Sequence, residues 1–386
     1  MMTSDSFRPT FWAALVAAVA LSACSGYSPP KPAPLVALDA SVAAVQVPVV
    51  WESRLGPVGR LLQPVRVPGG WAVPDDKGQV RGLDAASGKT LWSADFGQAL
   101  SAGVGSDGQV VAGITGTRTL RVMAVQGDGA GKPLWSVALD SAVVTPPLVA
   151  GERVFVLMQN QSVAAYDART GRYLWLQKVG DRTAELALDA PGLLTAQGGR
   201  LVVGLGAVLA SLDPATGAPV WSQPLSGVRA SNEIERLAVP LAPALARGNT
   251  LCLRLFSTGV QCMDAATGQP QWQTRLDGAQ GLGGDANWVL AVDGSDRVFA
   301  WQPPASTPSW RMDSLLNRGL TTPVLVGNRV VVGDAQGYVH VLDLANGQLV
   351  ARFSAGGSAV RSLQADGADG VLVLSADGRV ATYRLR

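Results

Sequence analysis

The sequence predicts an all-β protein, an eight-bladed β-propeller whose blades each consist of four antiparallel strands. Three observations lead to this fold class. Short Val-rich and Leu-rich runs alternate with Gly, Asp and Asn along the chain, a motif containing Asp, Gly and Trp recurs about every 40 to 50 residues, and helix signals are scarce. The chain has 386 residues, 47% of them hydrophobic, which is too long for one ordinary compact domain but suits a repeat architecture.

The first 23 residues have the pattern of a lipoprotein signal peptide. Arg8 precedes an apolar run over 11–20, and the run leads into LSAC, which resembles the bacterial lipobox. The run is shorter than the roughly 18 to 20 apolar residues that span a bilayer. We therefore expect cleavage before Cys24 and lipidation of that cysteine, since several acyl chains give stable anchoring. Ser25 favours the outer membrane by resemblance to enterobacterial sorting. An ordinary secretory signal with an incidental cysteine is the alternative.

Residues 24–48 are predicted to form a flexible tether. The stretch combines small residues with several prolines, which are Pro29, Pro30, Pro32, Pro34 and Pro48. Such a composition favours an extended chain without a packed core. The tether would hold the propeller, predicted to span 49–386, away from the lipid surface.

Each position of the repeat motif has a physical reason. In VRGLDAASGKTLW, residues 80–92, an Asp is followed four residues later by Gly and eight residues later by Trp. The apolar run before Asp is a strand, the Asp side chain accepts backbone N–H groups in the turn, and Gly supplies the positive φ that the turn needs. The next strand carries Trp to the blade edge, where the ring can bury roughly 150 to 250 Å². Trp is therefore predicted to fasten neighbouring blades. The clear copies have their aspartates at Asp84, Asp167, Asp213 and Asp264.

The repeat count requires a blade shared by the two chain ends. Copies of the motif end 38 to 51 residues apart, at Trp92, Trp135, Trp175, Trp221, Trp272, Trp310 and Ala351, where the last lacks the expected Trp. An eighth tryptophan, Trp51, lies 41 residues before the first of these, and the C-terminal sequence supplies inner strands without an outer one. Pairing a strand at 49–52 with one at 380–385 completes the eighth blade. This closure leaves no open sheet edge.

The sequence contains few signals for chemistry. Lys and Arg total 31 and Asp and Glu total 29, so the net charge of +2 favours neither nucleic acid nor an acidic partner. No cluster has metal-ligand spacing, and no phosphate-binding glycine loop is present. His340, the only histidine, lies in the strand-like YVHVLD. A Ser-His-Asp triad around it is conceivable, but a packed or solvated side chain is the commoner role. We predict no enzyme activity, no catalytic residues, no metal and no cofactor.

Two cysteines remain after the predicted lipidation. Cys252 and Cys262 flank a turn centred near Ser257, which places them opposite each other on one face of a hairpin. In an oxidising compartment this geometry permits a cross-strand disulfide. Two buried free thiols are the equally open alternative.

The repeat resembles the tryptophan-docking motif of quinoprotein dehydrogenases, which are eight-bladed propellers built around pyrroloquinoline quinone and calcium. Those enzymes are longer and carry adjacent paired cysteines near the quinone, whereas no two cysteines are adjacent here. A quinone-dependent dehydrogenase is therefore the less favoured, enzymatic alternative.

Lipobox, proline tether and eight docking repeats together resemble the BamB family of outer-membrane protein assembly factors. The resemblance covers the mature chain and is sharpest in SNEIERL, residues 231–237, and in the stretch 313–343. It implies a non-catalytic scaffold lipoprotein that faces the periplasm, binds the POTRA domains of BamA and aids folding and insertion of outer-membrane β-barrel proteins. The Bam complex and unfolded outer-membrane proteins would be its further partners.

The same resemblance implies a partner-binding site in two loops. The family's Leu-x-Leu-Arg-Gly loop corresponds to Leu186, Leu188 and their neighbours, with Asp189 where the family has arginine. That replacement removes the basic group with which the family makes its polar contact. The second loop would contribute Glu233, Glu235 and Arg236, for which a solvated charged loop is the alternative. The rival interpretation of the whole chain is a propeller lipoprotein that recognises another periplasmic protein or a glycan.

Overall fold

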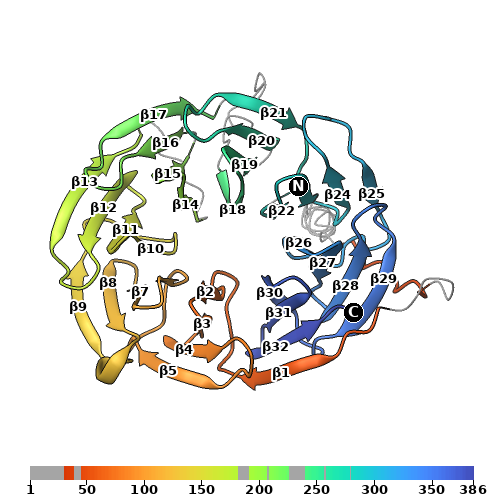
Figure 1. The fold of residues 1–386 in the computed structure, drawn as a ribbon, viewed down its shortest axis with the longest axis horizontal. Coiled ribbons are helices and arrows are strands. Elements are labelled where there is room, and N and C mark those ends of the chain that lie inside the picture. Colours follow the sequence, from red (N-terminus) through yellow and green to blue (C-terminus); the bar gives the residue numbers. More distant parts are fainter. Residues whose placement is uncertain are drawn as a thin grey trace, which may run out of the picture. The chain divides into compact units, whose positions relative to one another are not determined.

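The strands of this protein form eight four-stranded antiparallel sheets arranged as a ring (Figure 1). The computed structural model describes residues 30–38, 45–180, 191–206, 208–225, 240–255, 258–278 and 280–386. The chain divides into two units, 1–32 and 33–386, and the propeller belongs to the second. Among the described residues no helix is long and apolar enough to cross a membrane. The predicted fold class, including the number of blades, is confirmed.

We number the blades along the chain and give their strands from the ring centre outward. Blade 1 contains β2 (Val65–Val67), β3 (Gly70–Pro74), β4 (Gln79–Asp84) and β5 (Thr90–Asp95). Blade 2 contains β6 (Gly105–Ser106), β7 (Val110–Thr115), β8 (Thr119–Ala124) and β9 (Pro133–Ala138), with the short 3₁₀ helix η1 (Gly127–Gly129) before β9. Blade 3 contains β10 (Leu148–Ala150), β11 (Arg153–Leu157), β12 (Ser162–Asp167) and β13 (Tyr173–Lys178). Blade 4 contains β14 (Leu193–Gln197), β15 (Arg200–Leu205), β16 (Val208–Leu212) and β17 (Pro219–Pro224).

The remaining blades follow the same order. Blade 5 contains β18 (Pro240–Arg247), β19 (Thr250–Leu255), β20 (Gly259–Asp264) and β21 (Pro270–Thr274). Blade 6 contains β22 (Gly283–Gly284), β23 (Val289–Val292), β24 (Val298–Trp301) and β25 (Trp310–Met312). Blade 7 contains β26 (Val324–Val326), β27 (Arg329–Gly333), β28 (Tyr338–Asp343) and β29 (Leu349–Ser354). Blade 8 contains β30 (Val360–Asp366), β31 (Gly370–Ser375), β32 (Arg379–Arg384) and β1 (Val49–Arg54).

Blade 8 is closed by the two chain ends, as the repeat count predicts. β1 pairs antiparallel with β32, with Trp51 opposite Thr382 and Arg54 opposite Arg379. The pairing extends beyond the strands, because Gln46 and Arg386 exchange two backbone hydrogen bonds of 2.7 and 2.9 Å. The N-terminal strand therefore supplies the outer edge that the C-terminal strands lack.

Tryptophans fasten most of the blades to their neighbours. The indole N–H of Trp51, on the outermost strand of blade 8, donates to the Ala85 carbonyl in the last turn of blade 1 at 2.8 Å. Its ring lies against Gly88 of the same turn, where an added Cβ would meet it at 2.3 Å. Five further tryptophans make the corresponding bond to the next blade, and they are Trp135, Trp175, Trp221, Trp272 and Trp310. The predicted fastening role is confirmed at these six interfaces.

Two interfaces depart from this pattern, each for a local reason. Trp92 faces a turn that contains η1 in place of the Asp-x-x-x-Gly sequence, and its ring instead lies over Gly82 of its own blade. Ala351, on β29, faces blade 8, where the third and fourth strands are the two ends of the chain. No turn exists there for an indole to dock on. Val45 and Val47 pack against this part of the core instead.

The turn chemistry and the hairpin cysteines also follow the sequence. The Asp167 carboxylate accepts hydrogen bonds from the N–H groups of Arg169 and Thr170 and from the Thr170 hydroxyl. The hydroxyl and backbone bonds from Thr170 hold the pKa of Asp167 below its ordinary value.

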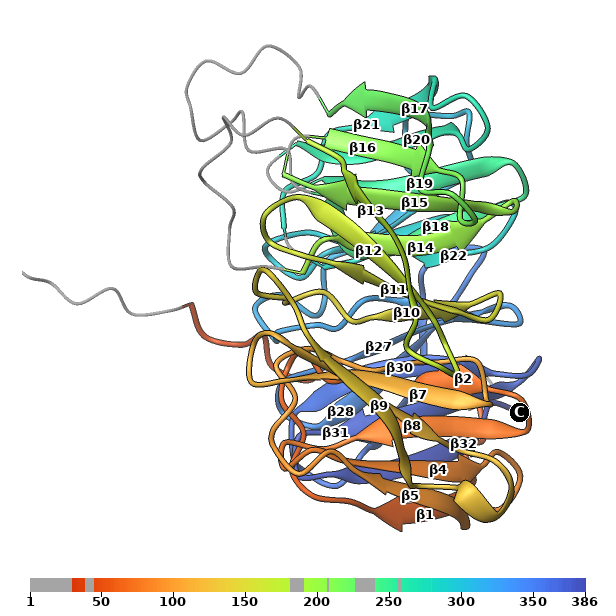
Figure 2. The same ribbon diagram turned by 90° about the vertical axis from the view of Figure 1, so that its left-hand side faces the viewer.

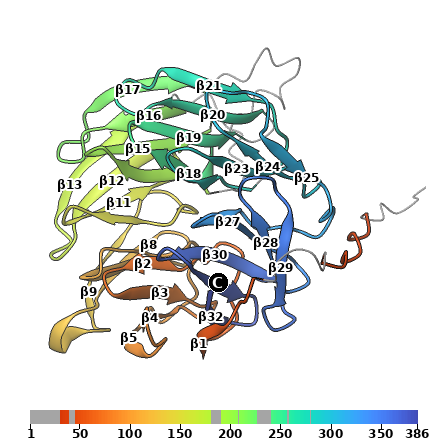
Figure 3. The ribbon, with the colours of Figure 1, turned by 45° about the vertical axis from the view of Figure 1, so that its right-hand side comes forward.

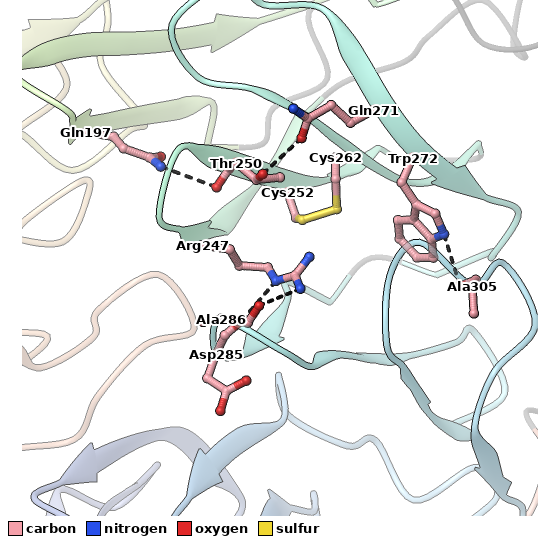
Figure 4. Close-up of a disulfide and its surroundings, with 10 residues drawn as sticks. All are labelled: Gln197, Arg247, Thr250, Cys252, Cys262, Gln271, Trp272, Asp285, Ala286 and Ala305. Atoms are coloured by element: carbon pink, nitrogen blue, oxygen red, sulfur yellow. Dashed lines mark hydrogen bonds between the residues drawn. A yellow bond between two sulfur atoms is a disulfide. The ribbon is translucent and has the colours of Figure 1, made fainter.

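Cys252 and Cys262 lie directly opposite each other on β19 and β20 and form a disulfide (Figure 4). Of the two alternatives, the structure therefore contains the disulfide.

The glycine beneath each docked indole provides a first testable prediction. Gly217 has a φ of +75°, and an added Cβ would lie 2.6 Å from the Trp175 ring. Gly198 has a φ of +57° with nothing within 4 Å of such a Cβ. Gly198→Ala is expected to cost about 1 kcal/mol of unfolding free energy from backbone strain. Gly217→Ala is expected to cost about 1 to 3 kcal/mol more, because the ring must move. Urea denaturation would measure both, and equal losses would contradict the docking role of Gly217.

Candidate partner-binding face

The up-and-down order of strands gives the propeller two different faces. Turns between the first and second strands, and between the third and fourth, lie on one face, which we call the hairpin face. Turns between the second and third strands lie on the opposite face, together with the linkers that join each outermost strand to the next innermost one. We call this the linker face. The linkers do not pair with neighbouring strands, so strand pairing does not constrain their sequences, and their side chains can contact other molecules.

All predicted site residues lie outside the described residues. Leu186, Leu188 and Asp189 belong to the linker between β13 and β14, and Glu233, Glu235 and Arg236 belong to the linker between β17 and β18. These are linkers of successive blades, so the described residues on either side of them lie on the linker face. Cys24 also lies outside the described residues. The partner-binding and lipidation assignments therefore stay predictions.

A buried ion cluster lies under the linker face of blade 7. Arg318, in the linker between β25 and β26, is 5% exposed and binds the Asp334 carboxylate through Nε at 2.7 Å and Nη2 at 2.6 Å. The same carboxylate oxygen lies 2.9 Å from Nε2 of His340 on β28. Both Asp334 and His340 are fully buried. Two cationic or hydrogen-donating groups thus converge on one carboxylate.

The protonation of the cluster follows from burial and pairing. Burial opposes ionisation of Asp334, but the hydrogen bonds from His340, from the N–H of Tyr338 and from Arg318 outweigh it, so the pKa of Asp334 is lowered. Burial lowers the pKa of His340 and favours its neutral form. Among the described residues Nδ1 of His340 has no hydrogen-bond partner, so the arrangement lacks the nucleophile of a Ser-His-Asp triad. His340 is a packed side chain, the commoner of the roles considered for it.

The Asp334 turn of this cluster belongs to a second local pattern, which was not predicted from the sequence. Asp75, Asp293 and Asp334 each begin a turn between a second and a third strand. Each accepts the N–H groups two and four residues later, as Asp334 does from Gln336 at 2.9 Å and Tyr338 at 2.8 Å. This second repeated Asp turn marks the linker face, just as the Asp-x-x-x-Gly turn marks the hairpin face.

Two described parts of the predicted tether contact the propeller. Ala33 donates its N–H to the Leu316 carbonyl at 2.8 Å, and the Ala33 carbonyl accepts a bond from Arg318 Nη1 at 2.8 Å. The Val36 carbonyl accepts a bond of 2.6 Å from Arg352 on β29. Further along the chain, residues 45–48 lie alongside the end of β32 and are hydrogen-bonded to it and to Arg386. Both segments lie beside blade 7 or blade 8, next to β29 in the views of Figures 1 and 3.

A cavity of about 560 Å³ opens on the inner side of blades 6 to 8. Its wall mixes apolar and polar residues, and the polar ones are Arg60, Gln63, Gln280, Thr321, Thr322, Arg361, Ser362 and Gln364. No carboxylate belongs to this wall, and the described residues contain no group of three His, Cys, Asp or Glu able to hold a metal. Calcium requires several oxygen ligands, usually carboxylates among them. The described cavity therefore does not fit the calcium and quinone of the dehydrogenases whose repeat the sequence resembles.

Comparisons with known proteins agree with the fold and identify relatives. The family model described as outer membrane protein assembly factor BamB matches residues 76–312. The protein of that name from Burkholderia pseudomallei is 32% identical over 380 residues, which cover 97% of each chain. The one from Bordetella pertussis is 34% identical over 317 residues, covering 81% of this chain and 80% of the relative.

Solved structures share the propeller over most of its length. The crystal structure of BamB from Moraxella catarrhalis has a TM-score of 0.75 at 24% identity and covers 88% of this chain and 100% of that one. Quinohemoprotein alcohol dehydrogenase from Comamonas testosteroni has a TM-score of 0.65 at 14% identity, covering 88% of this chain and 76% of that one. These structural likenesses concern the fold alone. The sequence matches cover up to 97% of this chain, and by them it belongs to the family of outer membrane protein assembly factor BamB.

Proposed function

We propose that this protein is a non-catalytic scaffold of the β-barrel assembly machinery that binds the POTRA domains of BamA and aids assembly of outer-membrane proteins. Membership of a family named for outer-membrane protein assembly carries the proposal. The described structure supports it, because the ring has a face on which the linkers between blades begin and end, and a cavity whose wall lacks the carboxylate ligands that the dehydrogenase alternative needs.

The partner surface of the proposal is the pair of linkers after β13 and β17. Leu186 and Leu188 fall outside the strand repeat, so the repeat assigns neither leucine to a blade core. Glu233, Glu235 and Arg236 in the next linker would surround an apolar contact with charge. A few apolar anchors with a polar rim is the usual composition of a protein interface. Asp189 would stand at the position where the family's arginine makes its polar contact.

The location of the scaffold is part of the same proposal. Residues 1–23 would be removed as a signal peptide, and Cys24 would carry the lipid that holds the protein on the periplasmic side of the outer membrane. Residues 24–48 would join this anchor to the propeller at 49–386. The net charge of +2 gives no case for nucleic acid as a partner.

The proposal predicts that the double variant Leu186→Ala, Leu188→Ala binds purified BamA POTRA domains at least about 30-fold more weakly. This ratio corresponds to about 2 kcal/mol, the loss expected for hot-spot residues. The double variant Leu91→Ala, Leu134→Ala is the matched control, since these leucines are 59% and 44% exposed on outermost strands. Calorimetric titration would measure affinity, and a thermal melt would report the fold.

The outcomes separate the candidate functions. Unchanged affinity in the linker variant would reject the surface. If the unaltered protein does not bind POTRA domains, the assembly role is rejected in favour of another periplasmic partner. A large fall in melting temperature only in the linker variant would assign both leucines to a core.

A further inference from the structure

The N-terminal segment contacts the propeller at two places that belong to opposite faces. β1 and β32 are the fourth and third strands of blade 8, so the end of β32 and the start of β1 lie on the hairpin face. Residues 45–48 lie there, because Gln46 exchanges backbone hydrogen bonds with Arg386 and the Pro48 carbonyl accepts the N–H of Arg384 at 3.1 Å. The chain therefore enters the ring from the hairpin face.

The other contact is on the linker face. Ala33 exchanges hydrogen bonds with Leu316 and Arg318, which both belong to the linker between β25 and β26. Figure 2 shows the C-terminus, to which residues 45–48 are bound, on one side of the ring and the segment 33–38 on the other. The two described segments, 33–38 and 45–48, therefore dock on opposite faces of the propeller.

On the linker face, the guanidinium of Arg318 is fixed by contacts that do not involve the N-terminal segment. Nε and Nη2 of Arg318 are bound by Asp334, which leaves Nη1 aimed at the Ala33 carbonyl at 2.8 Å. A buried cationic donor is costly to leave without an acceptor, so the Ala33 carbonyl completes the hydrogen bonding of Arg318. Three residues further along the segment, the Val36 carbonyl accepts a hydrogen bond from Arg352. Side chains of this segment stay partly in solvent, with Val36 54% exposed, so backbone recognition dominates.

We infer that the docked segments 33–38 and 45–48 act together as a strap between the linker face and the hairpin face, so that a lipid on Cys24 draws the linker face toward the membrane. The inference rests on the proposed lipidation. Ala33 is nine positions after Cys24, a reach of about 30 Å at full extension, whereas a free tether to Val49 could extend about 85 Å. With the strap docked, the ends of β13 and β17, after which the predicted partner-binding residues follow in the sequence, lie on the membrane-proximal face.

The first experiment uses the full lipidated chain on vesicles that contain nitroxide-labelled lipid headgroups. A fluorophore is placed on Lys77→Cys, in the β3–β4 turn of the linker face, or on Lys89→Cys, in the β4–β5 turn of the hairpin face. We expect quenching at least twofold stronger at position 77. The strap variant Ala33→Pro, Arg352→Ala removes the N–H of Ala33 and the donor to the Val36 carbonyl, so it should make the quenching at the two positions equal. The control variant Arg54→Ala removes only an exposed ion pair, so it should leave the difference in quenching unchanged. Equal quenching in the unaltered chain would overturn the inference.

A second experiment tests the strap without lipid. In the Cys24→Ala chain, spin labels on Val36→Cys and Lys89→Cys should give one narrow distance distribution, which broadens when Ala33→Pro and Arg352→Ala are added. A broad distribution in the unaltered strap would overturn the inference even if the protein is lipidated. A narrow distribution combined with loss of vesicle binding by the full chain would instead reject the proposed lipidation and, with it, the membrane orientation.

Discussion

Deleting residues 45–54 is expected to lower the free energy of unfolding by more than about 5 kcal/mol, or to prevent folding altogether. The deletion removes β1, which forms the outer edge of blade 8, and with it the docked indole of Trp51. Truncation of a buried Trp side chain alone costs about 3 to 5 kcal/mol. The loss of β1 also exposes the hydrogen-bonding edge of β32 and uncovers the core next to Ala351 that Val45 and Val47 cover.

A deletion of residues 28–38 is the matched comparison. It removes the hydrogen bonds of Ala33 and Val36 but no strand, so it is expected to cost less than about 3 kcal/mol. Thermal melts and urea denaturation of both deletions would measure the difference. Equal melting temperatures would contradict the role of β1 as the strand that closes the ring.

The parts of the fold that the sequence predicts are those that depend on residues close together in the chain. The Asp-x-x-x-Gly turn, the following Trp and the hairpin around Ser257 each need only residues within about a dozen positions, so their geometry follows from turn and strand preferences. Closure by the chain ends follows from counting, because seven repeats leave the inner strands of one blade at the C-terminus and one outer strand at the N-terminus. The absence of Trp at position 351 then has a reason that the count alone does not supply, since the next blade has no turn to receive it.

The parts that sequence analysis missed depend on contacts between distant residues. Ala33 and Arg318 are 285 positions apart, and a proline-containing segment has no periodicity that indicates where it docks. Arg318, Asp334 and His340 come from a linker, a turn and a strand, which only the folded blade brings together. The candidate partner site is the reverse case. Its residues were assigned from the resemblance of two loop sequences to those of the family. They lie outside the described residues, so the site stays a prediction.

Replacing Asp334 is expected to be among the most damaging single substitutions in the propeller. The Asp334 carboxylate accepts two backbone N–H groups of its turn and also binds Arg318 and His340. Removing one partner of a buried ion pair costs about 3 to 5 kcal/mol, because an uncompensated charge stays buried. With Asp334→Ala, Arg318 would lose the group that balances its charge and would no longer be aimed at Ala33.

The equivalent turn in blade 1 makes it possible to measure the contribution of the turn to stability apart from that of the ion cluster. Asp75 accepts the N–H groups of Lys77 and Gln79 at 2.9 and 3.0 Å but, among the described residues, is bound to no arginine or histidine. Asp75→Ala is therefore expected to cost about 1 to 3 kcal/mol for the unpaired N–H groups. Asp334→Ala should cost at least about 3 kcal/mol more. Asp334→Asn keeps an acceptor for the turn and provides a measurable variant if the alanine protein does not fold. Urea denaturation of the three variants decides the matter, since equal losses at positions 75 and 334 would mean that the arginine and histidine contribute nothing to stability.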